Sequence, residues 1–265
     1  MSAREAIERA GREGRAALIG YLPAGYPDVP TSVAAMRAMV AGGVDVVEVG
    51  LAYSDPLMDG PVIQRATEAA LAGGATPADG FTAVRALSGV PALVMTYWTL
   101  VDRYGVERFA ADLVAAGGAG LITPDLIPDE AAHWHAVADR HGLDRVHLIA
   151  PTSSRERIEL AARSSRGFLY AASLMGVTGE REAVSAGARD LVTRAREVAD
   201  LPVCVGLGVG DGTQAAEVAR FADGVIVGTA FVRALMDAPD VPSGLAAVEA
   251  VARELAAGVR QRVPA

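Results

Sequence analysis

The sequence lacks lysine altogether, because all 24 of its basic residues are arginine. Without lysine the chain cannot form an imine with a carbonyl compound, which excludes a Schiff-base aldolase and a resident pyridoxal phosphate. Any cleavage of a carbon–carbon bond would therefore have to rely on carboxylates and on a substrate that activates itself.

Cysteine is scarce, and a positive net charge and long apolar runs are missing. The single cysteine, Cys204, lies in the apolar run LPVCVGLG, so a disulfide framework is excluded and a buried, inert thiol is expected. The net charge of −8 argues against binding to nucleic acid or to an anionic membrane. Residues 1–15 lack the apolar core of a signal peptide, and the longest uncharged stretch, residues 86–101, is too short to span a bilayer. We expect a cytoplasmic protein.

Short apolar segments recur along the chain, and stretches with helical periodicity, such as residues 31–43 and 106–116, lie between most of them. Each apolar segment ends near Gly, Pro, Asp or Ser, as strands commonly do. The expected strands are residues 16–23, 44–51, 91–98, 120–126, 145–151, 167–173, 202–208 and 224–230.

Eight alternations of strand and helix predict a (β/α)8 TIM barrel of the α/β class, with an additional N-terminal helix. The chain of 265 residues is close to the length of about 250 that is typical of this fold. No linker or change in composition divides it, so we expect a single domain over residues 1–265. A doubly wound open sheet is the alternative, but the turn after the first strand, PAGYPD, lacks G-x-G-x-x-G.

Glu48 stands inside the second expected strand, VDVVEVGL, which is apolar on both faces like a strand of a covered parallel sheet. A carboxylate there loses hydration, so it must be paired, shift its pKa or take part in chemistry. Because barrel enzymes keep catalytic groups at the carboxyl ends of their strands, Glu48 is the first catalytic candidate. Membership of a structural ion pair is the alternative.

The loops after the expected strands carry further candidates. Asp55 and Asp59 both fit turn chemistry, although a second acid near Glu48 would also suit acid–base catalysis. Gly208 and Gly228 follow the last two strands, where such barrels bind phosphate through backbone N–H groups and a helix N-terminus. These glycines alternatively serve only tight turns.

Other residue types offer no metal site. His133 and His135 face different directions on an expected helix, and His141 and His147 have no companion at ligand spacing. Tyr170 lies in a strand, where a tyrosine usually packs in the core with its hydroxyl bonded. Neither G-x-S-x-G nor Walker A occurs. We expect no metal and no cofactor.

An ordered set of motifs covers nearly the whole chain: VVEVG with SDP-x-x-DGPVIQ, then YAASLMGVTG, PVCVGLGV and ADGVIVGTAFV. In this order they resemble the tryptophan synthase α subunit family. The resemblance implies a lyase of L-tryptophan biosynthesis that cleaves indole-3-glycerol phosphate to indole and glyceraldehyde 3-phosphate by a retro-aldol reaction.

The resemblance also implies residue roles. Glu48 matches the general acid/base, and Asp59 matches the acid that binds the indole N–H and stabilises the charge developing there. Tyr21 matches an aromatic residue near the indole pocket, and Tyr170 a tyrosine beside the substrate. Thr178 matches a threonine that closes over the substrate and hydrogen-bonds a loop aspartate. The positions that match the phosphate site are Gly179, Gly208, Gly228 and Thr229.

The family further implies a partner, the pyridoxal-phosphate-dependent β subunit, in an α2β2-type complex. The neighbourhoods of Asp55 and Thr99 match the side that faces this partner. The sequence departs from the family there, with Ala52 in place of a usual Pro, and with Thr99 and Leu100 where Asn and Pro are common. These departures therefore bear on the coupling to the β subunit more than on the cleavage reaction.

Three alternatives remain open at this point. The chain could act without a β subunit, as a stand-alone lyase of a specialised pathway. It could be another phosphate-binding barrel enzyme, such as an isomerase or indole-glycerol-phosphate synthase, although the synthase usually carries catalytic lysines. A non-catalytic activating subunit is the third, and the presence of Glu48, Asp59 and Tyr170 argues against it.

Overall fold

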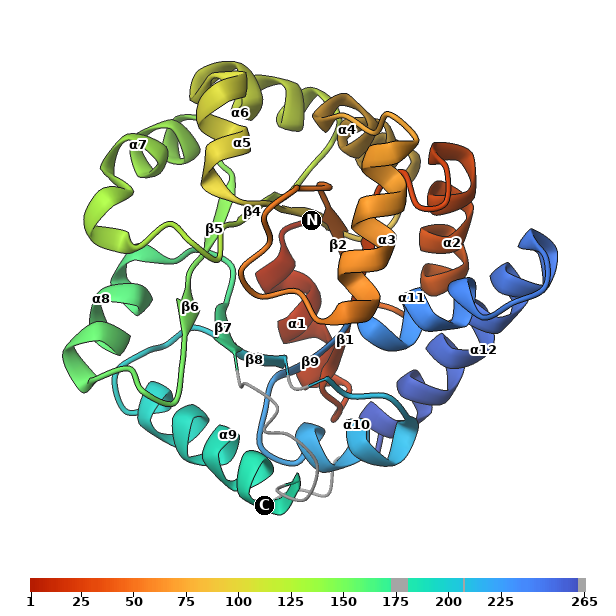
Figure 1. The fold of residues 1–265 in the computed structure, drawn as a ribbon. Helices are drawn as coiled ribbons and strands as arrows, with labels where there is room; N and C mark the ends of the chain where they lie inside the picture. The colour runs from red at the N-terminus through yellow and green to blue at the C-terminus, as the bar shows by residue number, and fades with distance from the viewer. Residues whose placement is uncertain (173–180, 207, 262–265) are drawn as a thin grey trace.

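The computed structural model describes residues 1–172, 181–206 and 208–261, with the backbone alone for 181–185. Its strands form one sheet in the order β5-β4-β3-β2-β1-β9-β8-β7-β6, and every neighbouring pair is parallel. The strands are arranged in a ring, and the helices other than the N-terminal one lie around it (Figure 1). The strands are β1 (Ala17–Pro23), β2 (Val46–Gly50), β3 (Ala92–Met95), β4 (Gly120–Ile122), β5 (Asp144–Val146), β6 (Leu148–Ile149), β7 (Leu169–Ala172), β8 (Val203–Gly206) and β9 (Gly224–Val227).

Helices alternate with these strands, which confirms the predicted barrel. A short 3-10 turn at Pro128–Glu130 precedes α7. The helices are α1 (Ala3–Arg12), α2 (Val29–Ala41), α3 (Pro61–Ala72), α4 (Pro77–Ala86), α5 (Trp98–Tyr104), α6 (Val106–Ala115), α7 (Ala132–His141), α8 (Arg155–Ser164), α9 (Arg181–Arg196), α10 (Gly212–Ala219), α11 (Thr229–Met236) and α12 (Val241–Val259).

The fifth predicted strand, residues 145–151, differs from the structure, because it is divided at His147 into β5 and β6. The first half pairs with β4 and the second half pairs with β7. At the break, the His147 N–H donates to the Ser165 hydroxyl at 3.3 Å rather than to a neighbouring strand. Each half therefore meets only one neighbour, and the two ends of the sheet come together at this segment.

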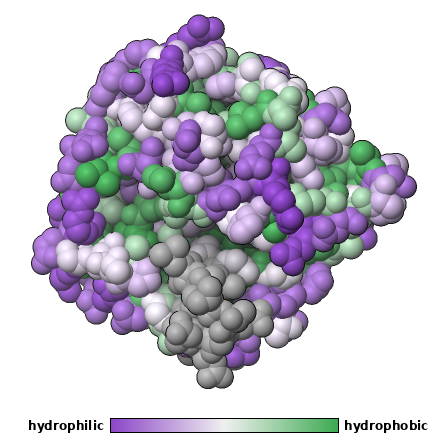
Figure 2. Space-filling model, viewed as in Figure 1, coloured by the Kyte–Doolittle hydropathy of each residue, from purple (hydrophilic) through white to green (hydrophobic). Residues whose placement is uncertain are grey.

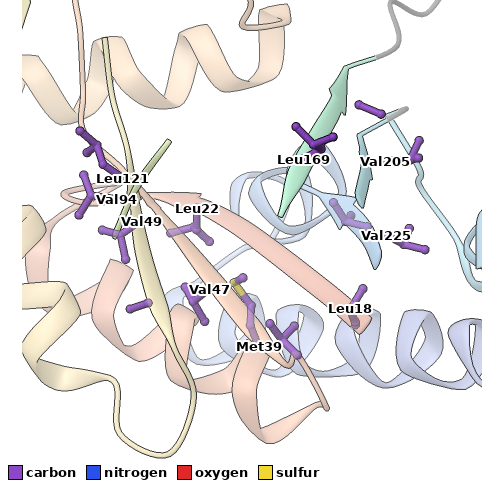
Figure 3. Packing of buried hydrophobic residues seen from close by; sticks show 14 of the residues in the cluster. Leu18, Leu22, Met39, Val47, Val49, Val94, Leu121, Leu169, Val205 and Val225 are labelled. Atoms are coloured by element: carbon purple, nitrogen blue, oxygen red, sulfur yellow. The ribbon is translucent and has the colours of Figure 1, made fainter. Parts of the chain in front are cut away.

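Alternation along the strands separates two apolar regions. Outward-facing residues such as Leu18 and Val47 pack beneath the helices, together with Met39 of α2 (Figure 3). Inward-facing residues, among them Ile19 and Phe168, fill the barrel. Parallel strands with apolar residues on both faces require cover on both sides, and here the barrel interior and the helices provide it.

Helix α1 fills one end of the barrel, and it is seen through the ring of strands in Figure 1. Its residues Ala6 and Ile7 belong to the same buried cluster as the inward-facing strand residues. A capping box between Ser2 and Glu5 begins the helix. The Ala3 N–H donates to the buried Asp144 carboxylate at 3.1 Å, which fixes the start of α1 to the start of β5. Only the end at which the strands finish remains open for a site.

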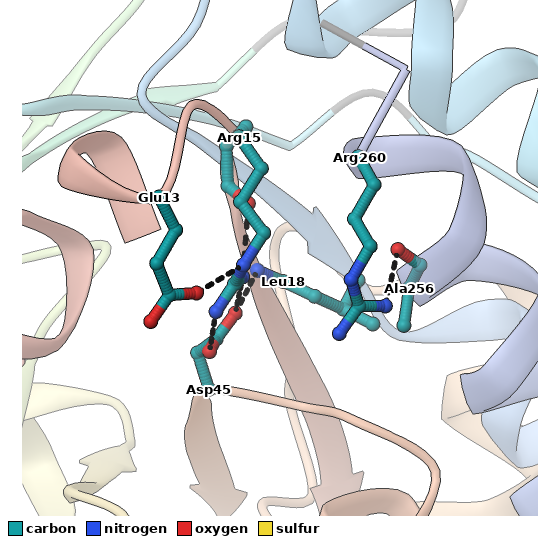
Figure 4. Close-up of polar contacts among 7 residues, drawn as sticks. Glu13, Arg15, Leu18, Asp45, Ala256 and Arg260 are labelled. Atoms are coloured by element: carbon teal, nitrogen blue, oxygen red, sulfur yellow. Dashed lines mark hydrogen bonds and ion pairs between the residues drawn. The ribbon is translucent and has the colours of Figure 1, made fainter. Parts of the chain in front are cut away.

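An ion pair at the closed end joins the starts of β1 and β2 (Figure 4). The Arg15 guanidinium donates to both Asp45 carboxylate oxygens, at 2.6 and 2.8 Å, and the Leu18 N–H donates to Asp45 at 2.9 Å. Both charged side chains are buried. The hydrogen bond to Asp45 raises the pKa of Arg15 above its ordinary value. This pair fixes the register of the first two strands at their origin.

Polar residues predominate along the rim of the molecule in the view of Figure 2, and apolar residues appear toward the hollowed middle of that face. In the residues that the structure describes, no helix combines the length and the apolar character needed to cross a membrane.

Replacement of Asp45 by Ala tests the ion pair. The change leaves the buried Arg15 guanidinium with only the half-exposed Glu13 carboxylate, 2.8 Å from its Nε, and leaves the Leu18 N–H without its acceptor. We expect the free energy of unfolding to fall by about 3 kcal/mol. Urea denaturation at neutral pH measures this loss. Glu8→Ala, which removes the exposed Arg4–Glu8 pair, is the control and should change the stability by less than about 1 kcal/mol. Equal losses in the two variants would contradict the assignment.

Candidate active site

Three predicted site residues lie on inward-facing positions near the ends of their strands. Tyr21 pairs in register with Glu48 across β1 and β2, and Tyr170 lies on β7. Each is two residues beyond an inward-facing apolar residue of the barrel core: Ile19, Val46 and Phe168, respectively. Because side chains alternate with a period of two, the three polar residues form the layer above the apolar filling.

Glu48 is completely buried, with an exposed fraction of 0%. Neither of its carboxylate oxygens has a hydrogen-bond partner among the described residues. Burial raises the pKa of this carboxyl from 4.5 to about 8, because the surroundings disfavour the charged form. In the described part of the chain no cation pairs with Glu48, so the alternative of a structural ion pair finds no support there. A carboxyl with a pKa near neutrality can both donate and accept a proton.

The two tyrosines are neighbours of Glu48, and its charge affects the pKa of both phenols. Burial is the main cause that raises the pKa of Tyr21 and of Tyr170, and the charges of Glu48 and Asp59 add to it. The phenol oxygen of each ring lies above a strand glycine. A methyl group on Gly50 would come within 2.4 Å of the Tyr21 hydroxyl, and one on Gly206 within 2.6 Å of the Tyr170 hydroxyl. These two glycines give the phenols their space.

The loop after β2 carries the second acid. Asp59 is half-buried, and burial raises the pKa of its carboxyl. Asp55 is exposed, with the Ser54 hydroxyl 2.5 Å from its carboxylate. The structure thus brings Asp59, rather than Asp55, into electrostatic reach of the tyrosines. Thr99 is exposed on the first turn of α5.

Tyr97 is a residue of this site that the sequence analysis missed. Its hydroxyl accepts hydrogen bonds from the backbone N–H groups of Leu57 and Met58, at 2.8 and 3.1 Å. Leu57 and Met58 precede Tyr97 by 40 and 39 residues in the chain, so no local pattern indicates the contact. The position of Tyr97 near the carboxyl end of the expected strand 91–98 was the only available signal.

The expected phosphate site has the predicted local structure. Gly208 has a φ of +66°, which favours glycine. Helix α11 begins at Thr229, directly after its N-cap Gly228, so its first N–H groups and positive end face the region above β9. A cavity of about 630 Å³ is lined by Gly208, Thr229 and Arg233 and by residues of α11 and α12, but neither Gly228 nor Glu48 lines it. Arg233, one turn after Thr229, was not predicted.

Two predicted substrate contacts, Thr178 and Gly179, lie outside the described residues. Cys204 is buried and free as expected. His147 has no companion at ligand spacing in the sequence, but in the structure its Nε2 lies 2.9 Å from Nε2 of His135. The two residues are brought together by α7 and the break between β5 and β6. The described residues contain no group of three or more potential metal ligands.

Comparison with known proteins gives matches over nearly the full chain. A family described as "Tryptophan synthase alpha chain" matches residues 7–260. The tryptophan synthase alpha chain of Thermobifida fusca is 58% identical over 262 residues, which cover 97% of each chain. That of Mycobacterium avium is 62% identical over 255 residues, covering 96% of this chain and 92% of the relative.

Solved structures give the same result. A structure of Mycobacterium tuberculosis tryptophan synthase matches with a TM-score of 0.90 and 56% identity, covering 97% of this chain and 98% of that one. The tryptophan synthase subunit alpha of Legionella pneumophila matches with a TM-score of 0.88 and 32% identity, covering 98% of both chains.

The raised pKa of Glu48 predicts a specific pH dependence of stability. Between pH 4.5 and about 8 the folded chain keeps the Glu48 proton, whereas the unfolded chain has lost it. The free energy of unfolding therefore falls by about 1.4 kcal/mol for each pH unit of rise in this window, and this contribution levels off above it. Glu48→Gln removes the dependence, so the variant should gain stability over the wild type as the pH rises from 5 to 8.

Urea denaturation at several pH values from 5 to 9 measures this difference. Glu68→Gln, at an exposed position on α3, is the control and should follow the wild type at every pH. If the Glu48→Gln curve also ran parallel to the wild type, the carboxyl would not carry its proton in the folded state.

Proposed function

The chain belongs to the tryptophan synthase alpha chain family, and on this premise we propose how its residues cleave indole-3-glycerol phosphate to indole and glyceraldehyde 3-phosphate. The observation that carries the mechanism is the buried, unpartnered Glu48 carboxyl with a pKa of about 8. It lies at the open end of the barrel, in one layer with Tyr21 and Tyr170. The reaction is a retro-aldol cleavage, and the enzyme is a carbon–carbon lyase.

Glu48 transfers the protons. At neutral pH most of its carboxyl groups are protonated, so it can deliver a proton to C3 of the indole ring. The resulting indoleninium accepts the electron pair of the carbon–carbon bond as that bond breaks. The Glu48 carboxylate then removes the proton of the glycerol hydroxyl, whose carbon becomes the aldehyde. The proton count balances, and Glu48 ends in the state in which it began.

Asp59 stabilises the positive charge on the ring. Its carboxylate accepts a hydrogen bond from the indole N–H, and this bond strengthens as the nitrogen becomes cationic. The interaction therefore lowers the free energy of the transition state more than that of the bound substrate. Partial burial supports this role, because a less solvated carboxylate interacts more strongly with a nearby cation.

The remaining residues position the substrate. Tyr21 and Tyr170 flank the reacting end, and the backbone of Gly208, Gly228 and Thr229 binds the phosphate at the start of α11. Thr178 and Gly179 are assigned to substrate binding from the resemblance alone. No lysine is needed at any step, in keeping with its absence from the chain.

The partner is a pyridoxal-phosphate-dependent β subunit, and the exposed Asp55 and Thr99 lie on the surface assigned to it. We place the enzyme in the cytoplasm, acting in tryptophan biosynthesis as one barrel domain. Identity above 55% to several tryptophan synthase alpha chains over nearly the whole length does not favour the alternatives of a stand-alone lyase, an unrelated barrel enzyme or a non-catalytic subunit.

Substitution of the two acids tests the mechanism. Glu48→Gln keeps the shape of the side chain but cannot exchange a proton, so turnover should nearly vanish while substrate still binds. Asp59→Asn should lower kcat by about two orders of magnitude or more, since the amide cannot neutralise the indoleninium. Steady-state indole release measures both effects. Near-wild-type kcat in either variant would remove that residue from the mechanism.

Titration with a β subunit tests the partner. We expect the purified chain to release indole from indole-3-glycerol phosphate slowly, and the rate to rise when a cognate β subunit is added. Rapid release that the β subunit leaves unchanged would instead indicate a stand-alone lyase.

A further inference from the structure

We propose that Tyr97 is a positioning residue for Asp59: its hydroxyl holds the backbone of the loop after β2 so that the Asp59 carboxylate faces the barrel interior. This inference rests on the proposed function, because it assigns the placement of one of the two catalytic acids.

The contact between Tyr97 and the loop joins a buried group to an exposed segment. Tyr97 is 7% exposed, whereas the side chains of Leu57 and Met58 are 82% and 41% exposed. Neither residue belongs to a buried apolar cluster of the described chain, so apolar packing in the core does not anchor this part of the loop. Their N–H groups instead converge on the single phenol oxygen, at 2.8 and 3.1 Å. The Tyr97 hydroxyl therefore attaches the two residues immediately before Asp59 to the barrel.

The backbone at Tyr97 is itself held in place. Tyr97 is the N-cap of α5, and the N–H of the next residue, Trp98, lies 3.0 Å from both carboxylate oxygens of Asp125, in the loop after β4. Its ring also packs against Tyr53 of the loop after β2, with 5.0 Å between the ring centroids, and this contact is kept when only the hydroxyl is removed. The phenol oxygen is thus a fixed point relative to β3 and β4.

A second fixed point follows Asp59. The Gln64 side-chain amide donates to the Asp59 backbone carbonyl at 2.8 Å, and Gly60 and Pro61 begin α3. The backbone of Asp59 is therefore restrained on both sides, by Tyr97 before it and by Gln64 after it.

The restraint places the carboxylate among the site residues. The Asp59 charge contributes to raising the pKa of both Tyr21 and Tyr97, so the carboxylate lies within electrostatic reach of both rings. Misplacement of a catalytic group by about 1 Å can cost a factor of about 100 in rate. Release of one restraint should consequently slow the reaction although no reacting group is lost.

Tyr97→Phe tests the proposal, because it removes the oxygen and keeps the ring. With the cognate β subunit present, we expect kcat for indole release to fall about tenfold or more. Affinity for indole-3-propanol phosphate, a substrate analogue without the glycerol hydroxyls, should stay within about threefold by calorimetry. Tyr104→Phe is the matched control: it removes a phenol oxygen that bonds Asp112 at 2.6 Å, and it should leave both quantities unchanged.

A double-mutant cycle shows whether Tyr97 acts through Asp59. If it does, adding Tyr97→Phe to Asp59→Asn should cause little further loss of kcat, since the placement of the residue no longer matters. A full additional loss in that background would overturn the proposal, and so would a kcat within twofold of the wild type for Tyr97→Phe alone.

Amide hydrogen exchange at Leu57 and Met58 provides a readout that does not depend on the reaction. Both amides should exchange faster in Tyr97→Phe than in the wild type. Unchanged exchange would contradict the proposal that the Tyr97 hydroxyl restrains the backbone of this loop. Absence of indole release from the wild-type chain with its β subunit would instead overturn the proposed function, so the two failures are distinguishable.

Discussion

Burial of the Glu48 carboxyl without a hydrogen-bond partner in the described chain is the constraint on which the proposed site depends. An isolated carboxylate cannot remain charged at low cost in such surroundings, so the group retains its proton up to a pKa of about 8. That condition requires a barrel interior closed to water from below, and α1 provides the closure by packing Ala6 and Ile7 among the inward-facing strand residues.

The two ends of the barrel accordingly have different tasks. The starts of the strands carry the strongest structural contacts, namely the Arg15–Asp45 pair and the hydrogen bond from Ala3 to Asp144. The strand ends instead carry groups whose interactions are incomplete, such as Glu48, or whose geometry depends on single contacts, such as the loop held by Tyr97. The contacts at the strand starts thus stabilise the barrel and compensate for the unsatisfied site groups at the strand ends, as is usual for this fold.

Much of the architecture and the main candidate residues followed from local patterns. Alternating strands and helices predicted the barrel, and glycine followed by a helical segment predicted the start of α11 at Thr229. Glu48 was identified because a charged residue inside an apolar strand is costly. The break at His147, the His135–His147 contact and the hold of Tyr97 on the loop were not predicted, because each joins segments that are distant in sequence.

The sequence by itself determined the elements, their order and the chemical types available to the site, including the absence of lysine, because periodicity and composition are local properties. Only the tertiary structure decided which side chains meet. Closure of the sheet turned Tyr21, Glu48 and Tyr170 toward one interior and removed water from the carboxyl. Pairing of β2 with β3 brought the Tyr97 hydroxyl within hydrogen-bond distance of the loop of Asp59. Solvation and long-range contact fix the pKa of a group and the position of a loop, and both arise only when the chain is folded.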